Sequence, residues 1–336
     1  MTFQPRHCPH SPCPSRLAKR PFLWRRRGHF RRQCDGRVVP RFLCLACRRG
    51  FSSQTFRLDY RLRLPTLHLD VFRLLVSKVS LRQAARVLNT RRRTVEQRQL
   101  LLGQHARDFQ RRALARRGPG ALPAGEYLLD EMETFERSRR VEPLTVPVLV
   151  ERESGFVVDV HVGTLPCRGR LSFRERQRKL ELEARHGKCR SQSNAVVRAC
   201  LKTLAQHVAE PGCVLKTDCK VTYPALIREE LGLRVRHERT PSSVKKSVRH
   251  PLFKLHVAQA MLRDGLSRMV RRNWSHSKVR RRLRVANWIW VAWKNWVRYR
   301  TNEDKRHSPA MLLGLAQGKW GIAEFFRWRV FEGVLV

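Results

Sequence analysis

Two close pairs of cysteines near the N-terminus could together hold a metal ion. Four residues separate Cys8 from Cys13, and two residues separate Cys44 from Cys47. One turn of chain can present two thiolates to a tetrahedral zinc ion, and two such turns complete a closed structural site. The spacing therefore favours zinc over unconnected thiols, and we expect the metal to supply the folding energy of this small, basic region. Cys34 is a fifth candidate that could replace one of the first pair, and His7 and His10 are also near.

Two aspartates in apolar, strand-like segments form a second candidate site. Acidic residues are scarce, with 27 Asp and Glu against 71 Lys and Arg. Asp130 lies within YLLDEMETFE, and Asp218 ends VLKTD. A carboxylate in an apolar strand is costly unless it is paired or binds metal, and ligands bind at the carboxyl ends of strands in open α/β sheets. Either aspartate alone is typical of a solvated strand end, but the pair could hold two Mg²⁺ ions and promote attack on a phosphodiester.

The net charge of the chain indicates the class of its partner. The formal net charge is +44 over 336 residues. Binding of nucleic acid releases condensed counterions, so nucleic acid is the expected partner, although a ribosomal protein could have the same bulk charge. No apolar run resembles a secretion signal or approaches the length of a membrane span. The ten cysteines do not form a dense disulfide framework, so we expect a cytoplasmic protein without a membrane partner.

Residues 75–102 have the layout of a helix-turn-helix. We expect Ser80 to cap a first helix with an apolar face, Asn89 to lie in the turn, and residues 94–102 to form the helix that contacts DNA. A plain helical hairpin packed on a core would show a similar apolar pattern, but the run of arginines favours DNA binding. Four arginines would then lie near phosphates or base edges: Arg91, Arg92, Arg93 and Arg98.

A second basic region follows near the C-terminus. Residues 271–300 contain ten Lys and Arg, no acidic residue and five tryptophans. Basic residues beside aromatic rings can track a nucleic-acid backbone, but helical spacing indicates that most of these rings pack against the protein core. Six basic residues are expected to contact DNA phosphates: Arg271, Arg272, Lys278, Arg280, Arg281 and Arg282.

The elements that must position these residues follow from apolar periodicity. From residue 126 onwards the expected order is three strands, a helix, a strand, a helix, a strand, and two long helices over roughly 255–272 and 278–300. This order predicts an α/β fold with a mixed sheet and helices on its faces. The expected divisions are 1–60 as a zinc-binding module, 61–117 as a helix-turn-helix, 118–125 as a linker, 126–300 as a core domain with a charged insertion at 165–190, and 301–336 as a tail.

Taken in order, these segments resemble the bacterial insertion-sequence transposases of the DDE superfamily, in a branch with a zinc ribbon and a helix-turn-helix. The resemblance implies an RNase H-like catalytic core in which Asp130 and Asp218 are the first two catalytic residues and bind Mg²⁺ or Mn²⁺. It also implies cleavage at terminal inverted repeats and strand transfer to target DNA by a homo-oligomer. The matching segments are RFLCLACRRGFSSQTF, SLRQAARVL, LLDEMETFE, LKTDCKVTYPAL and HPLFKLHVAQAMLRDGLSRMVRRNWSHSKVRRRL.

The last of these segments departs from the family pattern. The family has Glu, or Asn in one branch, with a basic residue seven positions on; the basic residue falls on Arg263, which puts the third catalytic position on His256. Neutral imidazole prefers softer ions than Mg²⁺ and brings no negative charge. An active transposase and a decayed or domesticated copy that only binds DNA both remain open, whereas an RNA-binding zinc-ribbon protein would not explain the two aspartates. Two other acids could substitute for the third position: Asp264 and Glu238.

Overall fold

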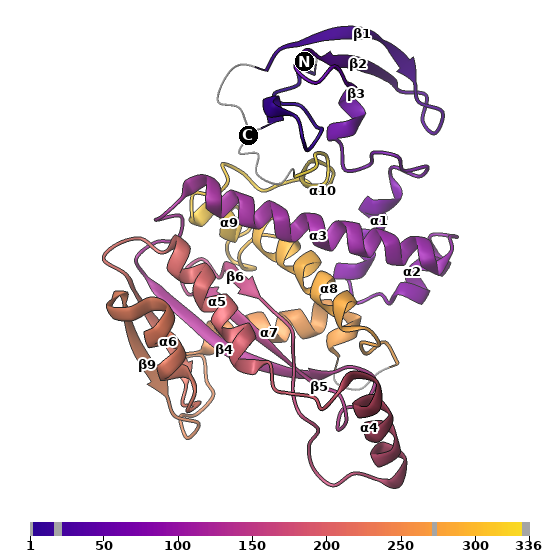
Figure 1. The fold of residues 1–336 in the computed structure, drawn as a ribbon. Coiled ribbons are helices and arrows are strands. Elements are labelled where there is room, and N and C mark those ends of the chain that lie inside the picture. The colour runs from indigo at the N-terminus through magenta and orange to yellow at the C-terminus, as the bar shows by residue number, and fades with distance from the viewer. Residues whose placement is uncertain (1–2, 17–21, 271–273, 331–336) are drawn as a thin grey trace. The chain divides into compact units, whose positions relative to one another are not determined.

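The computed structural model describes residues 3–16, 22–270 and 274–330, and the chain forms two compact units (Figure 1). Unit 1 consists of Met1–Asp70 and Trp320–Val336, and unit 2 consists of Val71–Lys319. Among the described residues, no helix combines the length and apolar character needed to cross a membrane. Two of the expected DNA contacts, Arg271 and Arg272, lie outside the described residues.

Unit 1 contains a three-stranded antiparallel sheet in the order β1 (Trp24–Arg31), β2 (Val38–Cys44) and β3 (Gly50–Ser52). Short helical turns η1 (Pro14–Arg16) and η2 (Ser53–Phe56) flank it, and α10 (Ile322–Phe325) comes from the C-terminal segment. That segment is hydrogen-bonded to the N-terminal part, because Leu58 N donates to Arg327 O at 3.2 Å and Arg329 N donates to Phe56 O at 2.8 Å. Unit 1 is therefore assembled from both ends of the chain.

Unit 2 begins with a helical region. Helix α1 (Leu67–Val76) spans the division between the units, and α2 (Leu81–Val87) and α3 (Arg92–Arg117) follow. Ser80 caps α2 as predicted, since its side chain accepts a hydrogen bond from Gln83 N. The second helix is much longer than the predicted 94–102 and packs along α8 (Arg280–Ala292). A Cβ atom at Gly103 would collide with Val285, so glycine permits this close helix contact.

The rest of unit 2 is built on a mixed sheet in the order β6-β5-β4-β8-β9, with β7 also paired to β5. Strands β4, β5 and β6 are antiparallel neighbours, whereas β8 is parallel to both β4 and β9. The predicted α/β class with a mixed sheet is confirmed. The strand bounds are β4 (Glu126–Phe135), β5 (Pro143–Glu151), β6 (Val157–Val160), β7 (Gly163–Thr164), β8 (Cys213–Asp218) and β9 (Val235–Thr240).

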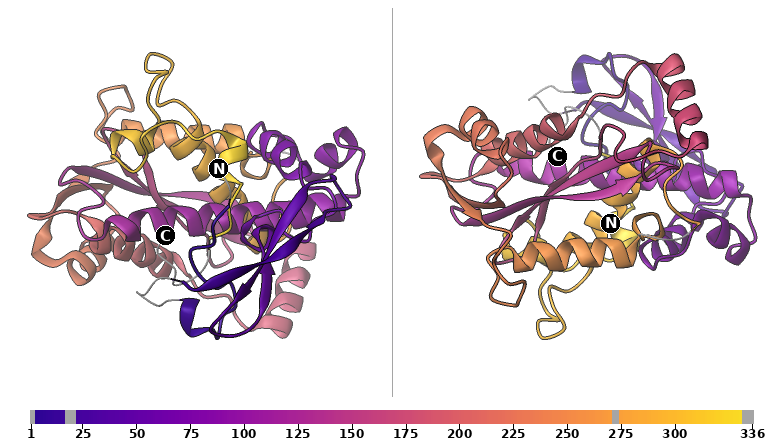
Figure 2. Two further views of the ribbon diagram at one scale, coloured as in Figure 1. Left: turned by 90° about the horizontal axis from the view of Figure 1, so that it is seen from above. Right: turned by 90° about the horizontal axis from the view of Figure 1, so that it is seen from below.

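Helices cover both faces of this sheet. Figure 2 shows α5 (Ser193–His207) and α6 (Tyr223–Leu231) on one face, and α7 (Phe253–Gly265) with α8 on the other. The sheet is buried between them, and every residue of β5 is buried, as expected for a strand covered on both sides. The remaining elements of unit 2 are α4 (Phe173–His186), η3 (Gly232–Arg234), η4 (Ser267–Met269), η5 (Trp293–Val297) and α9 (Pro309–Leu312).

The structure differs from the sequence-based expectation at two connections. Residues 118–125, expected as an interdomain linker, lie within unit 2, where Leu122 is buried and its N–H donates to His207 O at 2.9 Å. Its apolar side chain gains more from burial than an open linker would allow. The expected helix over 278–300 is α8 followed by a π-helical turn, η5, in which the chain widens before leaving the helix.

Lys294 in η5 is a buried cation, with only 5% of its surface exposed. Burial, together with the nearby positive charges of Arg298 and Arg300, lowers the pKa of Lys294 to about 8. Because this value lies below the value of 10.5 for a solvated lysine, the charged form opposes folding below pH 8. This opposition declines as pH rises from about 8 to 10.5.

We therefore expect Lys294→Met to raise the free energy of unfolding at pH 7 by on the order of 2–3 kcal/mol. The advantage over the native chain should shrink towards pH 10, as measured by denaturant unfolding at both pH values. Lys202→Met, on the exposed surface of α5, should change stability little and serves as the control. A less stable Lys294→Met protein at pH 7 would show that the ammonium group makes a favourable interaction.

Candidate functional site

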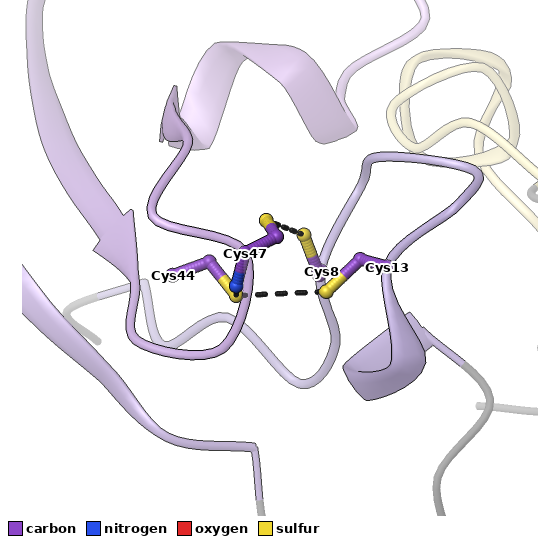
Figure 3. A group of neighbouring side chains, drawn as sticks. All are labelled: Cys8, Cys13, Cys44 and Cys47. Atoms are coloured by element: carbon purple, nitrogen blue, oxygen red, sulfur yellow. Dashed lines mark hydrogen bonds between the residues drawn. The ribbon is translucent and has the colours of Figure 1, made fainter.

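The four predicted zinc ligands lie together in unit 1 (Figure 3). Their sulfur atoms all lie within 4.8 Å of one another, and the Sγ–Sγ distance is 3.7 Å both for Cys8–Cys47 and for Cys13–Cys44. Four sulfurs at about 2.3 Å from a tetrahedral zinc ion would be roughly 3.8 Å apart. Burial raises the pKa of the Cys8 thiol well above its usual range, as expected when thiols gather without a cation. The cluster is therefore a possible metal site with room for zinc.

The alternative ligands do not join this cluster. Cys34 is exposed, and its Sγ lies 3.7 Å from Leu62 O. His7 Nδ1 is 3.1 Å from Cys8 O, and His10 Nε2 is 3.3 Å from Gly50 O. The two histidines thus contact the backbone around the cysteines rather than the space between their sulfurs.

Asp130 and Asp218 lie on neighbouring parallel strands. Leu128 of β4 pairs with Lys216 of β8, so the same register carried two residues further sets Asp130 opposite Asp218. Adjacent strands lie only about 4.8 Å apart. Both aspartates line one cavity of about 540 Å³ at this end of the sheet. Paired residues of neighbouring strands have their side chains on the same face of the sheet, so Asp130 and Asp218 share a face.

The surroundings of Asp130 disfavour the charged form of its carboxylate. Burial raises its pKa, and the negative charges of Asp218 and Glu131 add to the effect. Hydrogen bonds from Gln259 Nε2, at 3.1 Å, and from Glu131 N, at 2.7 Å, act in the opposite direction. Within the described residues, neither Asp130 nor Asp218 forms an ion pair. Carboxylate oxygens that face each other without a cationic partner suit a hard divalent cation such as Mg²⁺.

Glu131, next to Asp130, has a different environment. Its carboxylate accepts hydrogen bonds from Thr145 at 2.7 Å, from Ser193 at 2.8 Å and from Tyr223 at 3.1 Å, and it pairs with Lys220. Burial alone would raise its pKa, but Lys220 and the hydroxyl groups outweigh burial and lower it. Glu131 is therefore a charge-satisfied structural residue that ties β4 to β5, α5 and α6.

The third candidate position lies elsewhere. His256 lines a separate cavity of about 850 Å³, and its ring lies 5.0 Å from that of His250. Burial lowers the pKa of His256, and His250 contributes to the shift. Gln259, one turn further along α7, is the residue that contacts Asp130, and Arg263 Nη2 is 3.5 Å from Glu133 O. Gln259 lines the same cavity as His256, but its amide, rather than the His256 ring, is hydrogen-bonded to Asp130.

Sequence reasoning missed Gln259, because helical periodicity gives the face of α7 on which it lies but not which residue of that face meets Asp130. Residues three and seven positions beyond His256 share its face, so Gln259 and Arg263 lie on the same side of α7. The two alternative acids are both in other ion pairs. Asp264 pairs with Lys78 at 3.0 Å, and Glu238 pairs with Lys216 at 3.5 Å.

The arginines of the helical region fall into two groups. Arg91, Arg92 and Arg93 are exposed at the start of α3, and Arg92 pairs with Glu96 at 2.9 Å. Arg98 is only 7% exposed, which corrects the expectation that it faces a phosphate. It shares a helical face with Val95 and with other buried residues of α3, and this face packs into the unit.

The second set of predicted DNA contacts lies at the start of α8. Lys278 and Arg281 are exposed, whereas Arg280 pairs with Glu136 at 3.6 Å. Arg282 pairs with Glu96 at 2.7 Å, and Glu96 also holds Arg92. Glu96 thus joins the two basic sets, and the starts of α3 and α8 form a single candidate nucleic-acid surface on unit 2.

A further ligand cluster in unit 2 is satisfied internally. Donor atoms of Asp159, His161 and Cys200 all lie within 4.8 Å of one another. The Asp159 carboxylate already accepts hydrogen bonds from Val160 N at 2.8 Å and from Thr203 at 2.6 Å, and it lies 3.1 Å from His161 Nε2. These contacts account for the buried carboxylate by fastening β6 to α5.

We compared the sequence with protein-family models and with curated proteins. No protein-family model and no curated protein sequence matches this chain. Function must therefore be inferred from the two clusters, the aspartate pair and the basic surface.

Proposed function

We propose that this chain is a DNA-cleaving and DNA-joining enzyme of the DDE type, a transposase of a bacterial insertion sequence. The observation that carries the proposal is the aspartate pair: Asp130 and Asp218 stand opposite each other on parallel strands and line one cavity. A strongly basic surface on the same unit would bring DNA to such a site. The strand order, with three antiparallel strands followed by parallel β8 and β9, supports an RNase H-like core.

Asp130 and Asp218 would hold the divalent metal, Mg²⁺ or Mn²⁺. Such a metal, when bound, makes a water or a 3′-hydroxyl more nucleophilic and stabilises the oxygen that leaves phosphorus. The chain's own residues would fix the geometry: Gln259 orients the Asp130 carboxylate through its amide, and Glu131 holds β4 in place through Lys220. The proposed site thus combines two carboxylates that form no ion pair among the described residues with neighbouring residues that fix the position of β4.

The two basic sets of unit 2 and the module around the cysteine cluster would contact the DNA. Five exposed residues would contact DNA phosphates: Arg91, Arg92 and Arg93 at the start of α3, and Lys278 and Arg281 near the start of α8. The cysteine cluster would hold Zn²⁺ in a zinc ribbon that contributes a second contact region. We expect terminal inverted repeats and target DNA as substrates.

A DNA-binding protein without catalysis is the second candidate, and one observation favours it. The α7 side chain that meets Asp130 is the amide of Gln259, which supplies no third negative charge. A decayed or domesticated transposase would keep the basic surface and the zinc module while losing metal-dependent chemistry.

Cleavage of DNA carrying the sequences that flank the gene tests the proposed function. We expect Mg²⁺- or Mn²⁺-dependent nicks that leave 3′-hydroxyl ends, detected on labelled strands. Tight binding to these ends with no nicking under either metal would favour the DNA-binding protein. The absence of both binding and nicking would contradict both candidates.

Variants of α7 identify the third position. We expect Gln259→Glu to place a carboxylate beside Asp130 and to increase metal-dependent cleavage by about tenfold or more, which corresponds to about 1.4 kcal/mol of transition-state stabilisation. His256→Glu, which faces the neighbouring cavity, should have little effect. Gln259→Met is the matched control for the loss of the amide. Stimulation by His256→Glu instead would show that α7 turns when DNA binds, with His256 as the position that meets the metal.

A further inference from the structure

Helix α4 lies at one end of unit 2, in the charged insertion between β7 and α5 (Figure 1). A capping box at Ser172 starts the helix, yet none of its 14 residues is buried. Ion pairs hold it to the core, with Arg178 2.5 Å from Glu142 and Arg140 3.5 Å from Glu175. An isolated helix of this length is marginal in water, so a helix without buried residues indicates a surface that another molecule covers.

The exposed face of α4 has an apolar strip. Phe173 is 69% exposed and Leu180 is 59% exposed, and they lie seven residues apart on one side of the helix. Gln177 and Ala184 fall on the same side at the spacing of the next helical turns. Two large apolar side chains on one exposed helix face are typical of a helix-pairing surface rather than of a solvated arm.

The charges beside this strip are arranged so that the helix complements itself. Arg174 and Glu181 lie along one edge of the strip, and Arg176 and Glu183 lie along the other. At these four positions each edge is basic in the first half of the helix and acidic in the second half, and the exposed Arg185 follows Glu181 at the end of the helix. Arg174, Arg176 and Glu181 are exposed, and Glu183 is half-buried beside Lys179, 3.8 Å away.

We propose that α4 binds α4 of a second copy of this chain, antiparallel and about a two-fold axis. In that arrangement each basic half faces an acidic half, so Arg174 meets Glu181 of the second copy and Arg176 meets Glu183. The apolar strips then meet, with Phe173 against Ala184 and Leu180 against Gln177 of the other helix. A parallel pair would instead set like charges against like.

This arrangement does not rest on the proposed function, and DNA is a poorer occupant of the same surface. Phosphates would be repelled by Glu181 and Glu183, and they would leave Phe173 and Leu180 in water. The helix is about 21 Å long, so the contact is small and a weak, concentration-dependent dimer is expected.

Charge reversal tests the pairing in the full chain. We expect the native chain to dimerise in sedimentation equilibrium. Arg174→Glu with Arg176→Glu, and separately Glu181→Arg with Glu183→Arg, should each weaken dimerisation on the order of tenfold or more, because each pair of like-charged halves repels. An equimolar mixture of the two variants should form a heterodimer, since the four acidic positions beside one apolar strip then meet the four basic positions beside the other.

Several results would overturn the proposal. They are a native chain that stays monomeric at every concentration, a mixture that associates no better than its components, and variants that dimerise like the native chain. Binding of a short DNA duplex to each version, measured in parallel, tests whether DNA rather than a second copy of the chain occupies this surface. If no version dimerises while the first variant loses DNA affinity and the second gains it, the surface binds DNA.

Discussion

We expect replacement of Asp130 or of Asp218 by asparagine to abolish the metal-dependent DNA cleavage that we propose for this chain. Each substitution removes one of two carboxylates that face each other across β4 and β8. Metal-assisted phosphodiester chemistry depends on such ligands for several kcal/mol, so the cleavage rate should fall on the order of a thousandfold or more. The metal-free Asp130→Asn variant should be as stable as the native chain, or more stable by about 1 kcal/mol, because burial and neighbouring charges oppose the Asp130 carboxylate.

Glu131→Gln is the matched control for this prediction. It changes a carboxylate on the same strand, but that carboxylate pairs with Lys220 and accepts bonds from hydroxyl groups. We expect a loss of about 2 kcal/mol in the free energy of unfolding, less than for a fully buried pair because Lys220 is partly exposed. If Asp130→Asn destabilised the metal-free protein as much as Glu131→Gln does, Asp130 would be a structural residue and not a metal ligand.

We expect replacement of Cys44 by serine to abolish the zinc binding that we propose for the cysteine cluster and to unfold unit 1. The cluster sulfurs lie at the distances that a tetrahedral zinc would impose, and the aromatic core of the unit packs directly against Cys8, Cys13 and Cys44. Because a structural zinc site contributes on the order of 10 kcal/mol to a small domain, the sheet β1-β2-β3 should not persist without it. Metal content by mass spectrometry should fall from one zinc per chain to none, and limited proteolysis should cut within residues 22–70.

Cys34→Ser is the matched control, since Cys34 lies in the same unit but outside the cluster. It should leave both the zinc content and the proteolysis pattern unchanged. Unit 2 should resist proteolysis in both variants, because its sheet and helices form a separate compact body. A Cys44→Ser protein that kept a full complement of zinc would mean that the metal lies elsewhere.

Local signals in the sequence were sufficient for several parts of this structure. The spacing of Cys8, Cys13, Cys44 and Cys47 predicted the cluster, because close cysteine pairs leave few other arrangements in a small unit. Ser80 was predicted as a cap because it directly precedes a segment with a helical apolar face, and its side chain does accept a hydrogen bond from Gln83 N. The α/β class followed from the alternation of strand and helix patterns.

Other features depend on contacts between distant segments and were not predictable in the same way. Gln259 meets Asp130 because α7 packs on β4, and that register is set by tertiary packing rather than by sequence spacing. Arg98 lies among the buried residues of α3, a helix that packs against the distant α8, and the sequence of α3 alone does not show which of its faces is covered. The glycine and proline residues around Leu122 predicted a linker, but the Leu122 side chain is buried and its backbone pairs with that of Val208.

The construction of unit 1 from both ends of the chain has a consequence for biosynthesis. A ribosome makes residues 3–70 first, then the whole of unit 2, and only afterwards the segment that contains Trp328. The ring of Trp328 stacks on Phe3 at 5.6 Å, and its flanking residues bond to Phe56 and Leu58. The nascent N-terminal module therefore lacks these packing contacts until the ribosome has translated unit 2 and the segment that follows it. A premature stop codon after unit 2 would thus release a chain with an intact mixed sheet and an unfinished N-terminal module.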